Sequence, residues 1–563
     1  MYDCPDSIGD MTSLTQIVMD SATPALLEKV TAIRKRLNLV GKVEHHVHEI
    51  ESRGCSSIVD LVGLTCSELI LVDLQNVKRP GDAERVKLHD KSDTRVLKLL
   101  WKNKEGKSVL DRLVPPQSLE NLLLDGYRSK SFPNWLFRIS SCLPFLSELI
   151  LCDLEACDCL PPLGALPNLR NLGLYNIPNI RKIGKEFYGE GGPCLKLRVL
   201  TLTLMENLVE WWTTKSSDES QEFLIPNLHH LSVTDCPKLK FVPYPPRSMV
   251  WLLENSETVL PERGFGKLLS PIRPSEVIIK GCSFSQDKWD RLQHFPTLEK
   301  FDLNSVSGLR ALPEVMQCFT SLTSLYLFSL KGLETLPERL GHLGSLEKIS
   351  ICDCPNLTYF PESMKNLTAL KKLFLKECKG LEALPGWLGQ LTCLEEIHIE
   401  NIPNLKSLPE SMKNLTALNK LYFIECKGLE TLPGWLGQLT CLEYIFIEDL
   451  PNLTSLPESM KNPTALKMLT LIKCYALETL PECFGPLTCL EELIISVCNL
   501  TSLPESMKNL TALKRLSLRW CKGLEILPDW LRHLTALEAL TIGNCGNLTS
   551  VPESMKNLAA LKN

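Results

Sequence analysis

One pattern of apolar and polar positions repeats through residues 298–561. Residues 370–385 are LKKLFLKECKGLEALP and residues 394–409 are LEEIHIENIPNLKSLP; both follow L-x-x-L-x-L-x-x-C-x-x-L-x-x-L-P, with another apolar residue sometimes in place of Cys. The closing proline falls at eleven positions from Pro313 to Pro552, and nine of the ten intervals are 24 residues while one is 23. A fixed period of this length indicates a chain built from stacked, similar units.

Each fixed position of the unit has a physical role. Side chains alternate between the two faces of a strand, so Leu373 and Leu375 face one way and Phe374 faces the other. Pro385 suits the first position of a helical turn, and the leucines spaced by three residues after it predict a short helix or 3₁₀ turn. No unit can bury its leucine face alone, so stacked neighbours supply the core. The pattern predicts an α/β solenoid, a leucine-rich-repeat horseshoe with a parallel β-sheet on the concave face and short helices, 3₁₀ turns or loops on the convex face.

Alternate units are more alike than adjacent ones. LPESMKNLTAL at 408–418 alternates with LPGWLGQLTCL at 432–442, which gives a second period of 48 residues. This longer period indicates duplication of a block of two repeats.

The regularity of the pattern changes along the chain. We predict four parts, in chain order: degenerate N-terminal repeats at 1–60, irregular leucine-rich repeats with loop inserts at 61–242, an irregular proline-rich junction at 243–290, and regular 24-residue repeats at 291–563. Two polar inserts, 184–192 and 213–221, are predicted to be loops on the rim or the convex side.

Composition narrows the ligand class and the compartment. The 563-residue chain has a net charge of −5 and a pI near 6.1, which argues against nucleic acid as its main partner. It has no run of 18 apolar residues, which predicts no membrane span, and its acidic start lacks the features of a signal peptide. Seven of the 23 cysteines share one repeat position, which with the odd count predicts free thiols in a reducing compartment. We therefore predict a cytoplasmic protein.

A group of histidines is the strongest candidate for a metal site. His45, His46 and His48 lie near Cys55, but a strand here puts only His46 and His48 on one face. No second ligand pair has metal-site spacing, so solvated strand histidines and no bound metal are expected.

Neither a cofactor nor catalysis is predicted. Gly106-Lys107-Ser108 matches the end of a phosphate-binding loop, but Trp101 stands where that loop needs glycine. No Ser/His/Asp or Cys/His set stands outside the repeat pattern, so the sequence predicts a protein that is not an enzyme.

The residue between the two strand leucines points away from the core, and in several repeats it is aromatic. Successive strands place these residues about 4.8 Å apart in a row. The candidate partner-binding residues are Tyr326, Phe374, His398, Tyr422 and Phe446, with Tyr444 and Trp520 beside them. Cross-strand aromatic pairs stabilise sheets by themselves, and exposed aromatics on a rigid concave surface also form binding hot spots. Both interpretations, a structural ladder and a recognition surface, stay open.

The irregular first half contains more specific motifs. They are LVDLQNV (71–77), LKLLW (97–101), VLDRLVPPQSLENLLLDGYRSKSFPNWL (109–136), LPPLGALPNLRNL (160–172), IGKEFYG (183–189), MENLVEWW (205–212) and IPNLHHLSVTDCPKLK (225–240). Together they resemble the leucine-rich-repeat part of plant intracellular nucleotide-binding leucine-rich-repeat disease-resistance proteins of the coiled-coil class. The family's coiled coil and nucleotide-binding switch precede its repeats, and neither occurs in this sequence.

The resemblance implies an immune receptor whose repeats restrain the switch and sense pathogen effectors. The implied partners are a pathogen effector or a guarded host protein, and a nucleotide-binding domain in cis or in trans. Residues 28–112 carry 17 Lys and Arg against 13 Asp and Glu. By the resemblance, Arg34, Lys35 and Arg36 are candidates for docking on an acidic patch of the switch, although an ordinary solvated face explains the same charge.

An alternative class is a free-standing cytosolic leucine-rich-repeat scaffold of the Ras-group type, whose L-P-x-x-L-x-x-L-x-x-L repeats are similar to residues 298–561. Such scaffolds keep near-uniform repeats throughout, so the irregular first half favours the receptor class. A secreted receptor needs a signal peptide and cysteine caps, and a repeat ligase needs a catalytic domain beside the repeats. The sequence predicts neither.

Overall fold

The computed structural model describes residues 42–47, 58–102, 107–189, 192–215, 223–265, 272–462, 465–482 and 484–553. The chain forms two compact units, residues 1–277 and 278–563, and each is described by itself. Strand β13 (Glu276–Lys280) spans the division between them. Both units consist of short parallel strands joined by turns and single-turn helices, which confirms the predicted α/β leucine-rich-repeat solenoid.

In the second unit, each strand pairs in parallel with the next one in sequence. The strands are β14 (Lys300–Asn304), β15 (Ser324–Phe328), β16 (Lys348–Cys352), β17 (Lys372–Lys376), β18 (Glu396–Glu400), β19 (Lys420–Ile424), β20 (Tyr444–Glu448), β21 (Met468–Ile472), β22 (Glu492–Ser496), β23 (Arg515–Arg519) and β24 (Ala539–Gly543). Phe374 of β17 lies opposite Ser350 on one side and His398 on the other, so equivalent repeat positions form straight rows.

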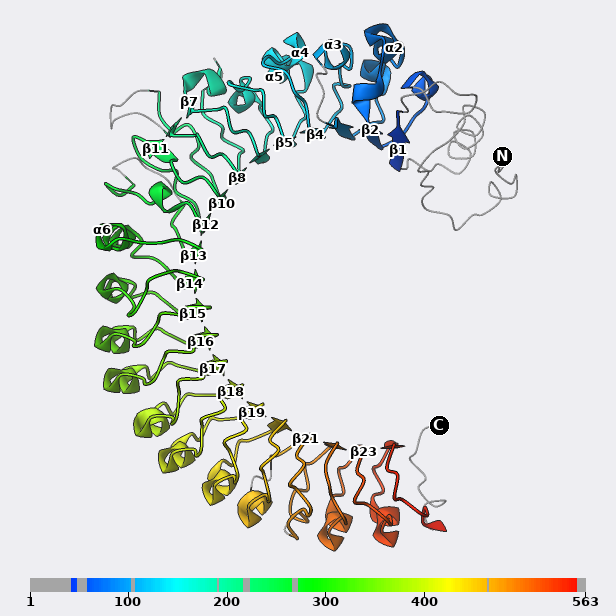
Figure 1. The fold of residues 1–563 in the computed structure, drawn as a ribbon, viewed down its shortest axis with the longest axis vertical. Helices are drawn as coiled ribbons and strands as arrows, with labels where there is room; N and C mark the ends of the chain where they lie inside the picture. Colours follow the sequence, from blue (N-terminus) through cyan, green and yellow to red (C-terminus); the bar gives the residue numbers. More distant parts are fainter. Residues whose placement is uncertain are drawn as a thin grey trace. The chain divides into compact units, whose positions relative to one another are not determined.

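Single-turn helices occupy the outer side of the second unit, opposite the strands (Figure 1). They are α6 (Gln286–Asp290), η8 (Arg291–His294), η9 (Glu314–Cys318), η10 (Glu338–His342), η11 (Glu362–Asn366), η12 (Gly386–Gln390), η13 (Glu410–Asn414), η14 (Gly434–Gln438), η15 (Glu458–Lys461), η16 (Glu505–Asn509) and η17 (Asp529–His533). All of them except α6 are 3₁₀ helices, one of the two forms that the leucine spacing predicts.

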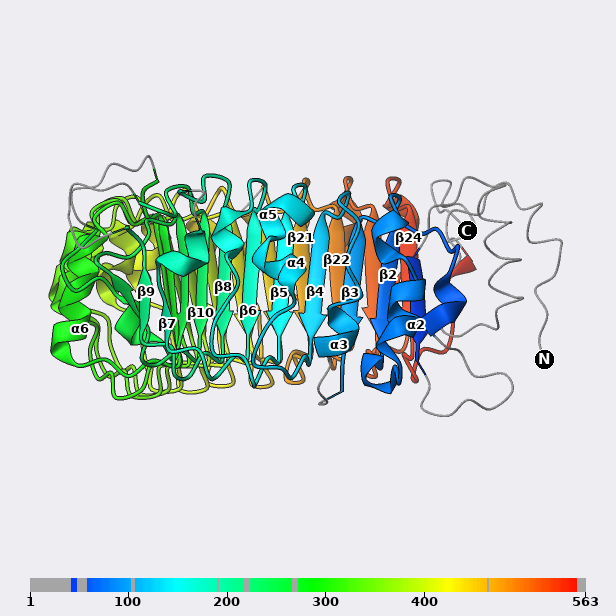
Figure 2. The same ribbon diagram turned by 90° about the horizontal axis from the view of Figure 1, so that it is seen from above.

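The first unit has the same inner sheet, whose neighbouring strands run side by side (Figure 2). Its strands are β1 (Lys42–His46), β2 (Glu68–Val72), β3 (Val96–Leu100), β4 (Asn121–Asp125), β5 (Glu148–Cys152), β6 (Asn171–Tyr175), β8 (Val199–Thr203), β10 (His230–Thr234) and β12 (Val250–Glu254).

The helices of the first unit are more varied than those of the second. They are η2 (Ile58–Leu61), η3 (Leu74–Asn76), α2 (Pro80–Arg85), η4 (Leu88–Asp90), α3 (Lys107–Leu110), α4 (Asn134–Phe137), α5 (Ile139–Cys142), η5 (Leu163–Ala165), η6 (Lys185–Tyr188) and η7 (Glu257–Val259). Part of this unit carries a second, three-stranded parallel sheet instead, formed by β7 (Lys182–Ile183), β9 (Glu210–Trp212) and β11 (Lys240–Val242). The buried Trp211 of β9 contacts Phe187 and Phe241, with ring centroids 5.3 and 6.1 Å apart.

The core follows the two-residue alternation of the strands. In β17, Leu373 and Leu375 are buried while Phe374 between them is half-buried on the inner face. Burial of one such leucine contributes about 1.5–3 kcal/mol relative to exposure. Because most strands supply only two buried side chains, a layer of core is complete only when the next repeat stacks on it.

The residue after each strand of the second unit has left-handed backbone angles. Glu377, Val497 and Trp520 have φ of 53°, 57° and 54°. The N–H of Glu377 donates to the carbonyl of Glu400 at the end of the next strand, at 2.9 Å. A non-glycine residue in this region costs about 1–2 kcal/mol, so the hydrogen bonds and core of the stacked repeats hold the turn.

The repeat proline lies one position earlier in the turn than predicted. Pro385 has φ −70° and ψ 144°, so it is the extended residue before η12 and not the first helical residue. Its carbonyl accepts the first hydrogen bond of the turn, from the N–H of Leu388 at 3.1 Å. Pro385 has extended backbone angles and is therefore not a helical residue, although its carbonyl still accepts a hydrogen bond from the turn.

A glycine in every second outer turn follows the 48-residue period, at Gly341, Gly389 and Gly437. A Cβ on Gly389 of η12 would lie 1.9 Å from the backbone oxygen of Ser411 in η13, and Gly341 and Gly437 are similarly close to the turns that follow them. The backbone of the turn that follows therefore packs directly against the glycine in η10, η12 and η14. As a result, η12 packs more extensively on η13 than η11 packs on η12.

Six of the seven cysteines at the shared repeat position are buried as the sequence predicts, and Cys545 is half-buried. Cys378 and Cys426 are fully buried, and the Cys378 thiol donates to the carbonyls of Lys376 and Ile351 at 3.4 and 3.8 Å. Burial is the main cause that raises the pKa of Cys378 to about 12. The described cysteines are free thiols.

The structure corrects the first of the two predicted polar inserts, and of the second it describes only residues 213–215. Phe187 and Tyr188, inside the first insert, form part of η6 and are buried, because their rings complete the core beneath the second sheet. Thr213 at the start of the second insert is buried, and its hydroxyl donates to the carbonyl of Tyr244 at 2.6 Å. Residues 190–191 and 216–221 lie outside the described residues.

The prediction of solvated histidines is wrong for His45. In β1 the alternation buries His45 together with Val43, while His46 is half-buried on the other face. The reason is that the inward face of the strand includes His45, so the ring belongs to the core. His48 and Cys55 lie outside the described residues.

We expect Gly389→Ala to destabilise the second unit by about 1–3 kcal/mol, because the added methyl overlaps the backbone of η13. The free energy of unfolding in urea measures this effect. Gly386→Ala in the same turn is the matched control: no atom lies within 4 Å of the position that its added methyl would take, so we expect a change below about 1 kcal/mol. Equal losses for both variants would contradict the pairing of the turns.

We expect Cys378 and Cys426 to resist a thiol reagent at pH 8 until the protein unfolds. Burial raises their pKa to about 12 and about 11, so almost no reactive thiolate forms in the native state. Cys393, Cys441 and Cys489 are exposed and should react at once. Peptide mapping after timed labelling separates the two groups, and fast native labelling of Cys378 would refute the buried row.

Candidate functional site

Six of the predicted partner-binding residues face the inner side of the second unit. They are Tyr326 of β15, Phe374 of β17, His398 of β18, Tyr422 of β19, and Tyr444 and Phe446 of β20. All six are half-buried, and the apolar residues that alternate with them fill the core. The rigid, in-register sheet fixes where each ring lies.

Four of these rings form one continuous stack, which we call the aromatic ladder: Phe374, His398, Tyr422 and Phe446. The ring centroids of Phe374 and His398 are 5.9 Å apart, and those of His398 and Tyr422 are 5.3 Å apart with the planes inclined by 20°. Tyr422 and Phe446 follow at 6.1 Å. Such pairs contribute about 0.5–1.5 kcal/mol beyond the burial of their area, so the ladder is both a partly exposed surface and a structural element.

Two lysines that the sequence did not single out extend the aromatic surface. The Lys348 ammonium lies 5.0 Å from the ring centroids of both Tyr326 and Phe374, which bridges the gap left by Ser350. The Lys420 ammonium lies 5.5 Å from the ring of Tyr444. The signal available in the sequence was a lysine at the first position of a strand, within reach of an aromatic residue on a neighbouring strand. Lys348 reaches its rings diagonally, and Lys420 lies directly opposite Tyr444.

Ion pairs border the ladder. The Lys376 ammonium lies 2.8 Å from the Glu400 carboxylate, and His398 Nε2 lies 3.2 Å from the same group. Burial acts to raise the pKa of Glu400, but hydrogen bonds from Lys376 and His398 outweigh it and hold this pKa below its ordinary value. Burial also raises the pKa of Tyr422, so its phenol stays protonated at neutral pH. The surface thus combines ring faces, a phenol and fixed charges.

The remaining predicted site residues are not part of this surface. Trp520 lies in the left-handed turn after β23, and 50% of its surface is exposed. The ring contacts among the described residues do not include it, so it is separate from the ladder. Arg34, Lys35 and Arg36, the predicted switch-docking residues, lie outside the described residues.

Metal-ligating clusters and membrane spans are both absent from the described part of the chain. Among those residues, no group of three or more His, Cys, Asp or Glu side chains is placed to hold a metal ion. Within the same residues, no helix is long and apolar enough to cross a membrane.

Comparisons with known proteins agree with the repeat pattern. The family described as R13L1/DRL21 LRRs matches residues 58–177, which lie in the irregular first unit. Among solved structures, a leucine-rich-repeat protein of Leptospira interrogans is 20% identical, with 84% of this chain and 91% of that chain covered and a TM-score of 0.40.

Curated relatives are plant disease-resistance proteins. The disease resistance RPP13-like protein 1 of Arabidopsis thaliana is 27% identical over 208 residues, which cover 33% of this chain and 19% of the relative. Disease resistance protein RGA2 of Solanum bulbocastanum is 31% identical over 109 residues, which cover 18% of this chain and 11% of the relative. The matches therefore span about a fifth or less of these relatives.

Fold and repeats define the class as leucine-rich-repeat proteins. Within that class, residues 58–177 match the R13L1/DRL21 repeats and the curated relatives are plant disease-resistance proteins, in agreement with the resemblance found in the sequence. This fold is an interaction module, whose rigid sheet presents rows of side chains to a protein partner.

A double-mutant cycle tests whether the ladder also stabilises the fold. We expect His398→Ala and Tyr422→Ala to show a coupling of about 0.5–1.5 kcal/mol in urea unfolding, because their rings stack at 5.3 Å. Phe374 and Phe446 are three strands apart in the same row, and their cycle should give less than about 0.5 kcal/mol. No coupling in the first cycle would exclude a structural contribution of that stack.

Proposed function

We propose that this chain is the non-catalytic protein-interaction module of a plant immune receptor. In this proposal its inner surface senses a pathogen effector or a guarded host protein. Its first repeats restrain a nucleotide-binding switch supplied in cis or in trans. The compartment is the cytoplasm, where such a switch and its effectors meet.

The continuous aromatic ladder is the observation that supports this proposal most directly. Equivalent middle positions hold serine at Ser350 and Ser517, and the strands that carry them keep the same register and the same buried neighbours. The core therefore does not require aromatic rings at these positions. Half-buried rings fixed on a rigid sheet lose little conformational entropy on binding, which is the property of interface hot spots.

Ancestry supports the receptor class over a uniform scaffold. The family match falls in residues 58–177, where the repeats are irregular, and the curated relatives are named as disease-resistance proteins. Restraint of the switch rests on this likeness and on the basic residues 28–112. The proposed division of labour gives 28–112 to docking on the switch and 291–563 to recognition.

Paired substitutions on the two faces of one strand test the recognition surface. Phe374→Ala and Tyr422→Ala should remove at least one protein that co-purifies with the wild-type chain from effector-challenged leaf tissue, since truncation of a hot spot costs about 2 kcal/mol or more of binding. Their melting temperatures should fall only slightly. Leu375→Ala and Leu421→Ala should instead lose about 2–5 kcal/mol of stability, because those side chains are fully buried.

Quantitative mass spectrometry of the captured proteins provides the measurement, with Glu410→Ala on an outer turn as the surface control. An unchanged set of captured proteins in the ladder variants, with folding intact, would place recognition elsewhere. A loss of stability as large as that of the core variants would make the ladder structural only.

A further inference from the structure

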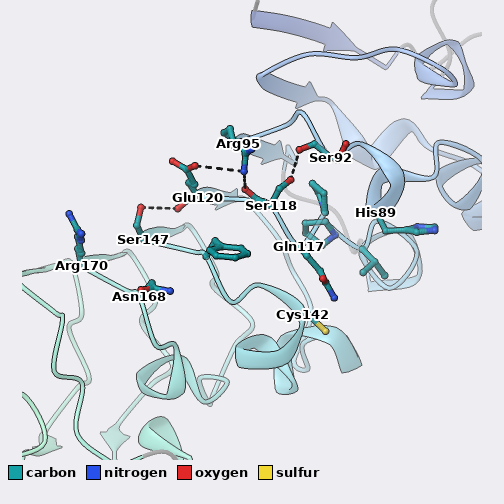
Figure 3. A pocket seen from close by; sticks show the side chains of 14 residues that line it. His89, Ser92, Arg95, Gln117, Ser118, Glu120, Cys142, Ser147, Asn168 and Arg170 are labelled. Atoms are coloured by element: carbon teal, nitrogen blue, oxygen red, sulfur yellow. Dashed lines mark hydrogen bonds and ion pairs between the residues drawn. The ribbon is translucent and has the colours of Figure 1, made fainter. Parts of the chain in front are cut away.

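A hollow of about 1010 Å³ lies at the rim of the first unit, far along the sequence from the ladder. Its walls come from the segments that precede strands β3, β4, β5 and β6, so it crosses four successive repeats. Arg170 and Asn168 lie at one end and His89 at the other (Figure 3). This volume is at the upper end of the range for ligand sites, which suits several residues of a peptide better than one small molecule.

Phe145 lines this hollow and is an unusual residue for its position in the repeat. It lies three residues before β5, and 60% of its surface is exposed. The same position before other strands holds small or polar residues, such as Asn168, Ala369 and Cys393. Packing within the repeat therefore does not explain a phenylalanine here. Val114, Pro115 and Pro116 add an apolar wall to the same hollow.

One arginine of this rim, Arg170, has no partner among the described residues, unlike the equivalent lysines of the second unit. In the second unit, a lysine just before a strand pairs with the glutamate just before the preceding strand in three places; for example, Lys371 lies 3.0 Å from Glu347, and Lys514 lies 2.7 Å from Glu491. At the equivalent position before β6, Arg170 is exposed, and no described residue forms a hydrogen bond or ion pair with its side chain. Arg198, at the same position before β8, is alike in both respects.

The third arginine of the rim is already engaged. Arg95 donates to the carbonyl of Ser118 at 2.9 Å and lies 3.8 Å from the Glu120 carboxylate (Figure 3). His89 similarly lies 3.2 Å from Asp90. The carboxylates of Glu120 and Asp90 would repel a polyanion such as nucleic acid, whereas the open guanidinium of Arg170 suits one carboxylate, which it can hold with two parallel hydrogen bonds.

We propose that this hollow binds an extended segment of a partner protein that carries an acidic residue next to a large apolar one. The apolar side chain packs on Phe145 and the proline wall, and the carboxylate pairs with Arg170. This second docking surface does not depend on the proposed function of the aromatic ladder. In this proposal, the first unit binds a partner protein through the hollow, separately from any partner of the aromatic ladder.

Synthetic peptides provide the probe. An array of ten-residue peptides that alternate Asp or Glu with Leu or Phe is compared with two matched arrays, one with Lys in place of the acids and one with Ser in place of the apolar residues. We expect the full-length protein to bind peptides of the first array alone, and the best of them is then measured by fluorescence anisotropy. Equal binding to the lysine array, or to a single-stranded DNA decamer, would overturn the proposal.

Substitutions then assign the bound peptide to the hollow. Phe145→Asn, which installs the residue found at position 168, and Arg170→Gln should each weaken binding about tenfold or more. Tyr475→Asn, another exposed aromatic, and Phe374→Ala in the ladder should change it less than about twofold. Added salt should weaken wild-type binding more than that of Arg170→Gln. Unchanged binding in Phe145→Asn, or a melting temperature lowered by several degrees in that variant, would refute the site.

Discussion

The fixed register between successive parallel strands is the constraint on which the rest of this molecule depends. It places each residue of one repeat beside its equivalent in the next, as Phe374 lies beside His398. Residues that recur with the period of the sequence therefore lie in rows along the sheet. The leucines form the layers of the core, the cysteines form a buried row, and the residues at the middle of each strand form a surface row. The left-handed turn that follows most strands of the main sheet is held by a hydrogen bond that this register supplies, as between Glu377 and Glu400.

The same conversion explains what could be predicted from the sequence. The period alone identified the strands, the alternation of buried and surface positions, and the row that contains Tyr422. The contact between Lys348 and the Tyr326 ring was not predicted. The repeat period shows which residues are neighbours within one row, but it does not show how far a long side chain reaches into another row. The pairing of the outer turns was also hidden, since Gly389 and Gly386 look equivalent in sequence although only one approaches the next backbone.

Errors arose where the pattern was weak. Glycine and charged residues around Phe187 and Tyr188 predict a polar loop at 184–192, yet those two rings are core. The burial of His45 was missed because a histidine gives no sign of burial unless the phase of its strand is known. In both cases tertiary packing overrode local composition. The sequence pattern does not distinguish a structural role of the aromatic ladder from a binding role, because both roles use the same rings.

Duplication of a two-repeat block has different consequences for the two faces of a strand. Tyr326, Phe374 and Tyr422 are spaced by 48 residues, so each further copy of such a block adds an aromatic position while it repeats the same kinds of turn and core contact. Leu375 and its equivalents vary only among large apolar residues such as Ile351, Ile399 and Phe423, because a cavity there costs about 2–5 kcal/mol. The middle positions can vary, since serine at 350 and threonine at 541 keep the same register. A solenoid of this kind therefore separates the residues that hold the fold from those that are free to change with a partner.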